Sequence, residues 1–201
     1  MKRLTQLFIM LLVFISGQAY DFKYEDFYYN VVDLSEFTVE ITRNSDDPSY
    51  FNNVDIVVPE FVSYQGREFK VIGIGANAFF KTTSFYNSLE HISMPNTIEY
   101  IGDGAFYNCI KLKNIEFPAS LKTIDDKAFY NCESIESITI PVNVEKIGLW
   151  SFVSCHSLTE MTIVDGEQEL IINSSIVDAQ TPITSFIYRK EYFIFTSFSG
   201  L

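Results

Sequence analysis

A spacing of 23 residues recurs through the middle of this sequence. All three cysteines follow it, at Cys109, Cys132 and Cys155. The same interval separates the members of four further series: Pro95, Pro118 and Pro141; Phe106, Phe129 and Phe152; Ile101, Ile124 and Ile147; and Leu89, Leu112, Ile135 and Leu158. Self-similarity at a fixed period indicates one supersecondary unit stacked on copies of itself. Such stacks present extended surfaces more readily than enclosed catalytic pockets.

Each regular unit divides into the same parts. The first opens at Leu89 with alternating apolar and polar residues, which is typical of a strand with one buried face. Ile92 and Met94 are expected to point inward, and His91 and Ser93 outward. A proline then ends the strand, and a short extended segment returns the chain. The sequence DGAFYNC follows, and its apolar residues have the i, i+3 spacing of a single helical turn.

Stacking brings equivalent residues into register. The phenylalanines are therefore expected to form an aromatic spine, and the cysteines a buried ladder of free thiols that behave as small hydrophobic side chains. Disulfides between neighbouring rungs are the alternative, but parallel side-chain directions give poor disulfide geometry. An odd number of cysteines also leaves at least one thiol unpaired within the chain.

The first 19 residues have the pattern of a secretory signal peptide. Lys2 and Arg3 precede the apolar run LFIMLLVFI, and Gly17-Gln18-Ala19 supplies small residues for cleavage after Ala19. The alternative is an uncleaved membrane anchor, but the run is shorter than the roughly 20 residues that a spanning helix needs. We therefore expect the protein to be secreted or at the cell surface, with no membrane span after signal cleavage.

Residues 20–53 do not follow the repeat. They contain two β-branched and aromatic runs, at 27–32 and 37–41, each bounded by turn-forming residues. The apolar end of a first repeat is exposed unless another element covers it. We interpret residues 20–53 as an N-terminal β cap.

Residues 54–164 carry the repeats. The first unit is irregular, because an insertion containing Tyr64-Gln65-Gly66-Arg67 separates its two halves and predicts a hairpin that turns at Gly66. After residue 164 the pattern is lost. Residues 165–201 are interpreted as a degenerate C-terminal repeat or cap, with the remains of a truncated array as the alternative.

The segments MPNTIEYIGDGAFYNC, FPASLKTIDDKAFYNC and IPVNVEKIGLWSFVSC resemble the BspA-type leucine-rich repeats of bacterial surface proteins. The resemblance covers residues 50–163 and implies a leucine-rich-repeat solenoid that is β-rich with short helical turns. It implies about four to five 23-residue repeats behind the small β cap. Asp125 stands where the middle unit usually has glycine, and Ser151 where the third has alanine. The family is associated with adhesion to host or bacterial surface proteins and has no shared catalytic chemistry.

No constellation in the sequence indicates catalysis. His91 and His156 lack partners at metal-ligand spacing, and the neighbouring acids Asp46-Asp47 and Asp125-Asp126 are interpreted as turn and surface residues. Dinucleotide, phosphate-loop and nucleophile-elbow motifs are absent from the sequence. We therefore predict no catalytic residue, no metal, no cofactor and no enzyme activity. A formal net charge of −12 disfavours nucleic acid and anionic lipid as partners.

The candidate site is a surface. Outward positions on the opening strands predict two parallel columns of small polar and acidic side chains on a concave sheet: His91, Ser93, Asn114, Glu116, Ser137, Thr139, Glu160 and Thr162. Such a sheet can recognise an extended partner through many modest contacts; the alternative is a solvated face without a partner. The leading hypothesis is a secreted or cell-surface protein that mediates adhesion or protein–protein binding, with a host or bacterial surface protein as its ligand. The alternative hypothesis is a truncated or purely structural repeat fragment without its own partner.

Overall fold

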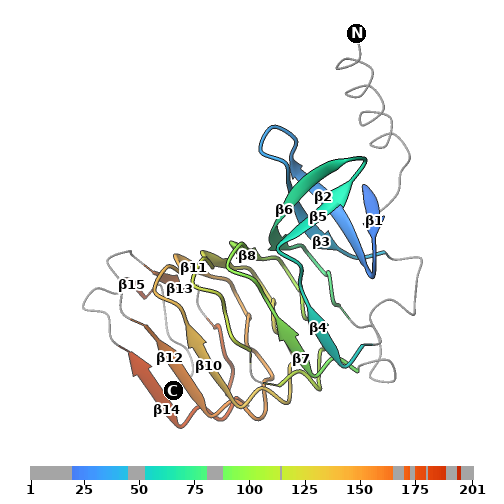
Figure 1. The fold of residues 1–201 in the computed structure, drawn as a ribbon. Helices are drawn as coiled ribbons and strands as arrows, with labels where there is room; N and C mark the ends of the chain where they lie inside the picture. The colour runs from blue at the N-terminus through green and yellow to red at the C-terminus, as the bar shows by residue number, and fades with distance from the viewer. Residues whose placement is uncertain are drawn as a thin grey trace.

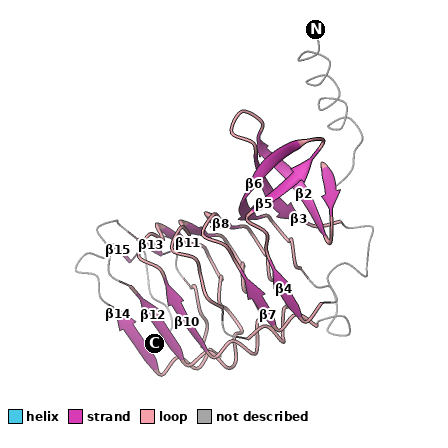
Figure 2. Cartoon of the chain, viewed as in Figure 1, coloured by secondary structure: helices cyan, strands magenta, loops and turns pink. Residues whose placement is uncertain are grey.

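The computed structural model of the chain describes residues 20–44, 53–80, 88–113, 115–164, 170–172, 175–179, 181–188 and 194–195. These residues form strands and turns and no helix (Figure 2). The strands belong to sheets of ten, three and two members. In Figure 1 the first strands gather at one end, and the later ones follow in successive rows. The predicted signal peptide lies outside the described residues.

The N-terminal segment contributes three strands: β1 (Phe22–Tyr24), β2 (Phe27–Asp33) and β3 (Thr38–Thr42). They pair antiparallel in sequence order, which confirms the two predicted runs as strands. β3 then pairs in parallel with β6 (Arg67–Ile74). The N-terminal strands therefore continue the sheet of the repeats through main-chain hydrogen bonds.

The predicted hairpin is confirmed. β5 (Phe61–Tyr64) pairs antiparallel with β6 across a two-residue turn. Both turn residues have left-handed backbones, Gln65 with φ of 51° and Gly66 with φ of 75°. This is the conformation of a type I′ turn, whose twist matches that of the flanking strands.

The short return strands stack in parallel beyond β6. They are β8 (Tyr100–Ile101), β9 (Thr123–Ile124), β11 (Lys146–Ile147), β13 (Ile171–Ile172) and β15 (Ile194–Phe195). Their register aligns Ile74, Ile101, Ile124, Ile147 and Ile172. The first four of these isoleucines are fully buried. The isoleucine series of the sequence is therefore one inward-facing row.

The opening strands form the two smaller sheets. β4 (Asp55–Val57) pairs in parallel with β7 (His91–Ser93), and β10 (Ser137–Ile140), β12 (Glu160–Ile163) and β14 (Ser185–Tyr188) form the other sheet. Residues 115–118, where the sequence predicts the equivalent strand, are not a strand. The front row of strands is therefore interrupted between β7 and β10.

The predicted helical turn is wrong. In residues 103–109, alternate N–H groups donate to the carbonyl three residues back, as in tight turns, and the others donate to the next unit. The bonds to the next unit are Gly104 to Asp126 (2.9 Å), Phe106 to Ala128 (2.8 Å) and Asn108 to Tyr130 (2.9 Å). A helix would direct every N–H along its own segment. An i, i+3 spacing of apolar residues fits a helix and a series of tight turns equally well. The turns form here because they leave N–H groups free to donate to the next unit.

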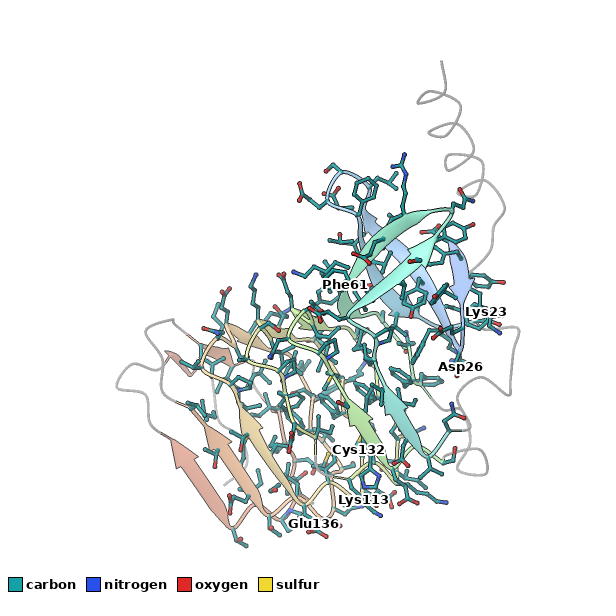
Figure 3. All side chains as sticks on the ribbon, in the orientation of Figure 1. Lys23, Asp26, Phe61, Lys113, Cys132 and Glu136 are labelled. Carbon is teal, nitrogen blue, oxygen red and sulfur yellow. The ribbon has the colours of Figure 1, made fainter. Side chains whose placement is uncertain are left out.

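Aromatic and sulfur ladders run through the core. Phe79, Phe106, Phe129 and Phe152 are stacked at centroid separations of 5.0, 5.1 and 5.3 Å and interplanar angles of 7° or less. The three cysteines are free and completely buried, which confirms the predicted ladder. Each thiol donates to a phenylalanine carbonyl of the preceding unit, at 3.4, 3.2 and 3.3 Å. Figure 3 labels Cys132 among the side chains of the repeats.

Repeat-type pairing continues beyond residue 164. β13 pairs with β11, β14 with β12 and β15 with β13, all in parallel. Thr181 takes the cysteine position, since its Oγ1 lies 3.4 Å from the carbonyl oxygen of Phe152. A hydroxyl thus takes the place of the thiol, although its shorter hydrogen bond, of 2.9 Å, is to Asp178 Oδ1.

Candidate functional site

The outward side chains of the opening strands form a polar face, which we call the front face. The strand registers align Asp55 with His91 and Ser137 with Glu160 in one column, and Val57 with Ser93 and Thr139 with Thr162 in the other. All of these side chains are exposed or half-buried, while Ile56, Ile92, Ile138 and Met161 between them are buried. The predicted alternation is therefore confirmed.

The structure brings the predicted residues together in two groups. His91 and Ser93 lie on β7, whereas Ser137, Thr139, Glu160 and Thr162 lie on β10 and β12. Glu116 is exposed between the groups, on the segment that is not a strand, and Asn114 lies outside the described residues.

Two front-face residues, Asp55 and Val57, are missing from the predicted set. Among the large apolar side chains of the described residues, Val57 is the most exposed, at 73%. The alternation of apolar and polar residues along 54–59 could have predicted them. A strand over these residues places Asp55 and Val57 on its outer side.

Two of the three front-face carboxylates that the structure describes form no ion pair within the protein. His91 Nδ1 lies 2.8 Å from Asp55 Oδ1, and both side chains are exposed, so this contact adds little stability. Among the described residues, Glu116 and Glu160 form no ion pair. Their carboxylates are therefore available to basic groups of a partner.

Lysines of neighbouring units are instead paired away from the front face. Glu90 binds Lys113 at 2.6 Å, Glu99 binds Lys122 at 2.6 Å, and Asp125 binds Lys146 at 2.8 Å. The hydrogen bond from Lys113 lowers the pKa of Glu90, and the bond to Glu99 raises the pKa of Lys122. Lys113 and Glu136 mark equivalent positions of successive units along one edge in Figure 3.

The buried thiols are not suited to act as nucleophiles. Burial raises the pKa of Cys155 to about 12 and that of Cys132 well above its ordinary value. A protonated, inaccessible thiol is a poor nucleophile. In the part of the chain that the structure describes, no cluster of three or more His, Cys, Asp or Glu side chains has the arrangement of a metal site.

A second surface feature was missed at the sequence level. A groove of about 440 Å³ lies over the turns of the later units, lined chiefly by Tyr107, Lys127, Tyr130, Trp150, Ser175 and Asp178. We call it the turn-side groove. Its residues come from four successive units, and the spacing from Trp150 to Ser175 departs from the regular period, so the repeat pattern did not reveal it.

The chain is similar to a known family of repeat proteins. A family model described as "BspA type Leucine rich repeat region (6 copies)" matches residues 72–198. The chain belongs to this family. The match confirms the resemblance, and it runs beyond residue 164, where the sequence pattern is lost. No curated protein matches the chain.

Solved leucine-rich-repeat structures share the fold. One from Bacteroides ovatus is 25% identical with a TM-score of 0.55, and one from T. pallidum is 23% identical with a TM-score of 0.62. The alignments cover 87% and 88% of this chain, and 50% and 85% of the other chains. This BspA-type protein thus spans about half the length of the B. ovatus protein.

One structural neighbour is described by its location. A leucine rich cell surface protein from Faecalibacterium prausnitzii is 20% identical with a TM-score of 0.55, over 85% of this chain and 55% of that one. At this identity the likeness shows the fold alone. In the described part of the BspA-type chain, no segment is a helix with the length and hydropathy that crossing a membrane requires.

Proposed function

We propose that this BspA-type protein is exported and binds a protein ligand on a host or bacterial surface through its front face. The observation that carries the proposal is the aligned pair of columns, in which exposed polar side chains and the exposed Val57 stand over a buried aliphatic row. The family membership and the surface location of one structural neighbour support it.

The chemistry of the front face favours a basic, extended ligand segment. Asp55, Glu116 and Glu160 supply carboxylates, and Ser93 and Thr139 supply hydroxyl groups that donate or accept hydrogen bonds. Complementary charge speeds association and fixes the register of the partner. Val57 adds an apolar contact at the end nearest the N-terminal strands. A ligand strand rich in Lys or Arg, with one apolar anchor, fits this arrangement.

Charge reversal on the front face tests the proposal. Biotin-labelled surface proteins of host epithelial cells and of bacterial cells are passed over the immobilised protein. The double variant Glu116→Lys and Glu160→Lys is expected to capture about tenfold less of a ligand than wild type does. The introduced lysines would repel the basic groups of the ligand. The control reverses two exposed acids away from the front face, Glu68 on β6 and Glu145 just before β11, with the same change in net charge.

The control variant separates local contacts from overall charge. Equal capture by wild type, the front-face variant and the control would contradict a front-face site. The alternative, a structural repeat fragment without its own partner, predicts that none of the three proteins captures a ligand.

A further inference from the structure

The turn-side groove contains residues in an unusual backbone conformation. Gly104, Lys127 and Trp150 occupy equivalent positions, because their N–H groups donate in the same way to the next unit, at 2.9, 2.9 and 3.0 Å. Their φ angles are 59°, 53° and 60°. Glycine adopts this left-handed region freely, whereas a bulky side chain there is strained. The left-handed conformation recurs in the turns of other units, at Asn77 (φ 56°) and Ser175 (φ 62°), so it belongs to the repeat. Glycine can take the place of Lys127 or Trp150 there without strain.

Core packing does not explain Trp150. The chain has a single tryptophan, and 42% of this residue is exposed. The Nζ atom of Lys127 lies over the ring, 5.4 Å from its centre, in a cation–π contact. An exposed aromatic side chain that lines a groove is a common feature of small-molecule sites.

Tyrosine side chains extend the aromatic lining of the groove. The rings of Tyr107 and Tyr130 are stacked at 4.8 Å with an interplanar angle of 5°, and both are half-buried. Stacking fixes these rings, so a ligand loses little side-chain entropy when it contacts them. The groove therefore offers rigid aromatic surface from three successive units.

The charged groups of the groove are of both signs. Lys127 supplies an ammonium group and Asp178 a carboxylate. Asp178 Oδ1 accepts hydrogen bonds from the backbone N–H of Thr181 at 3.0 Å and from its hydroxyl at 2.9 Å, which orient the carboxylate. A cationic ligand would meet Lys127 and an anionic ligand would meet Asp178. The balance favours a neutral ligand that uses both as hydrogen-bonding partners.

We propose that the turn-side groove binds a neutral saccharide. A sugar ring combines an apolar face of C–H groups with hydroxyls around its edge. The indole of Trp150 meets the apolar face, and the groups of Lys127, Ser175 and Asp178 bind the hydroxyls. The volume of about 440 Å³ lies within the range of small-molecule sites. This binding site is separate from the front face and does not depend on the proposed function.

The single tryptophan reports on the groove directly. Its emission is recorded while maltose, cellobiose, lactose or N,N′-diacetylchitobiose is added, with sorbitol as a control polyol. At least one disaccharide is expected to change the emission saturably, and sorbitol is not. Phe61→Ala serves as the matched control, because Phe61 is 45% exposed on β5 and lies outside the groove. It is expected to leave the titration unchanged.

Two glycine variants separate binding from stability. Trp150→Gly and Lys127→Gly give these positions the residue that Gly104 already has. Calorimetric titration with the active disaccharide is expected to show at least about tenfold weaker binding for Trp150→Gly. Its melting temperature is expected to equal or exceed that of wild type, whereas a structural role for Trp150 predicts a lower one. Lys127→Gly is expected to weaken binding less and to keep the fold.

Two results would overturn the assignment. One is no saturable response to any of the disaccharides. Another is undiminished saccharide binding by Trp150→Gly. If no saccharide gives a response, a proline hexapeptide is titrated in the same way. A saturable response to it would assign the groove to a neutral peptide instead.

Discussion

Each phenylalanine of the core lies face to face with the ring one unit away, and each cysteine binds the carbonyl of a phenylalanine in the unit before. Because the same residue recurs at the same position, neighbouring units are joined by a continuous row of non-covalent contacts. Truncating one buried ring of this kind typically costs about 3–5 kcal/mol. The residues that recur most regularly are therefore scaffold, and binding is left to positions that vary.

The thiols give a prediction at the scale of single residues. Native protein is expected to react very slowly with a thiol reagent at mildly alkaline pH, because all three thiols are buried and burial raises the pKa of Cys132 and Cys155. Denatured protein is expected to react at all three sites. Mass spectrometry of the labelled chain measures both. Rapid labelling of the native protein would contradict the buried ladder.

The same pKa shifts set a pH dependence. The folded chain holds these thiols protonated, whereas the unfolded chain releases the protons near the ordinary pKa of 9.0. Their contribution to stability is therefore complete below pH 9 and is lost as the pH rises toward about 12. Urea unfolding at increasing pH is expected to show this decrease, with the variant Cys155→Thr less affected than wild type. Threonine is chosen because Thr181 already serves at this position.

At the scale of elements, one contact joins the N-terminal strands to the repeats. The hydroxyl of Tyr100, on β8, donates to Glu40 Oε2 on β3 at 2.7 Å. Its ring lies over Gly73 of β6, where an added Cβ would be 2.1 Å from the ring carbon Cζ. The absence of a side chain at Gly73 is therefore what allows the tyrosine to reach across β6.

Gly73→Ala tests this junction. The methyl group is expected to displace the Tyr100 ring and to lower the free energy of unfolding by about 1–3 kcal/mol, measured by urea denaturation. In a Tyr100→Ala background the same change is expected to cost much less, because the space is already open. An equal cost in both backgrounds would show that the tyrosine does not occupy this role.

Elements differ in how well the sequence predicts them. The hairpin at Gly66, the strand alternation at His91 and Ser93 and the stack at Phe129 follow from local patterns that the fold keeps. The turns did not follow, because residues such as Phe106 have the same spacing in a helix and in successive turns. The break in the front strands after Leu112 also did not follow, since its sequence still alternates.

At the scale of the whole molecule, the two candidate sites also differ in how well the sequence predicts them. The outward positions of β7, β10 and β12 could be predicted because each has a fixed place in its unit. Glu116 is exposed but is not on a strand, Asn114 lies outside the described residues, and Asp55 and Val57 were left out with the irregular first unit. The turn-side groove could not be predicted. It depends on Trp150 and Asp178 approaching across a unit of altered length, and on a left-handed backbone that the sequence does not mark at a tryptophan.

Amide hydrogen exchange of the protein, with and without a captured ligand, tests the front-face proposal most directly. The account predicts that the ligand slows exchange on β7, β10 and β12, and leaves the return strands β9 and β11 unchanged. Slower exchange confined to the return strands or to the N-terminal strands, with β7, β10 and β12 unaffected, would contradict it.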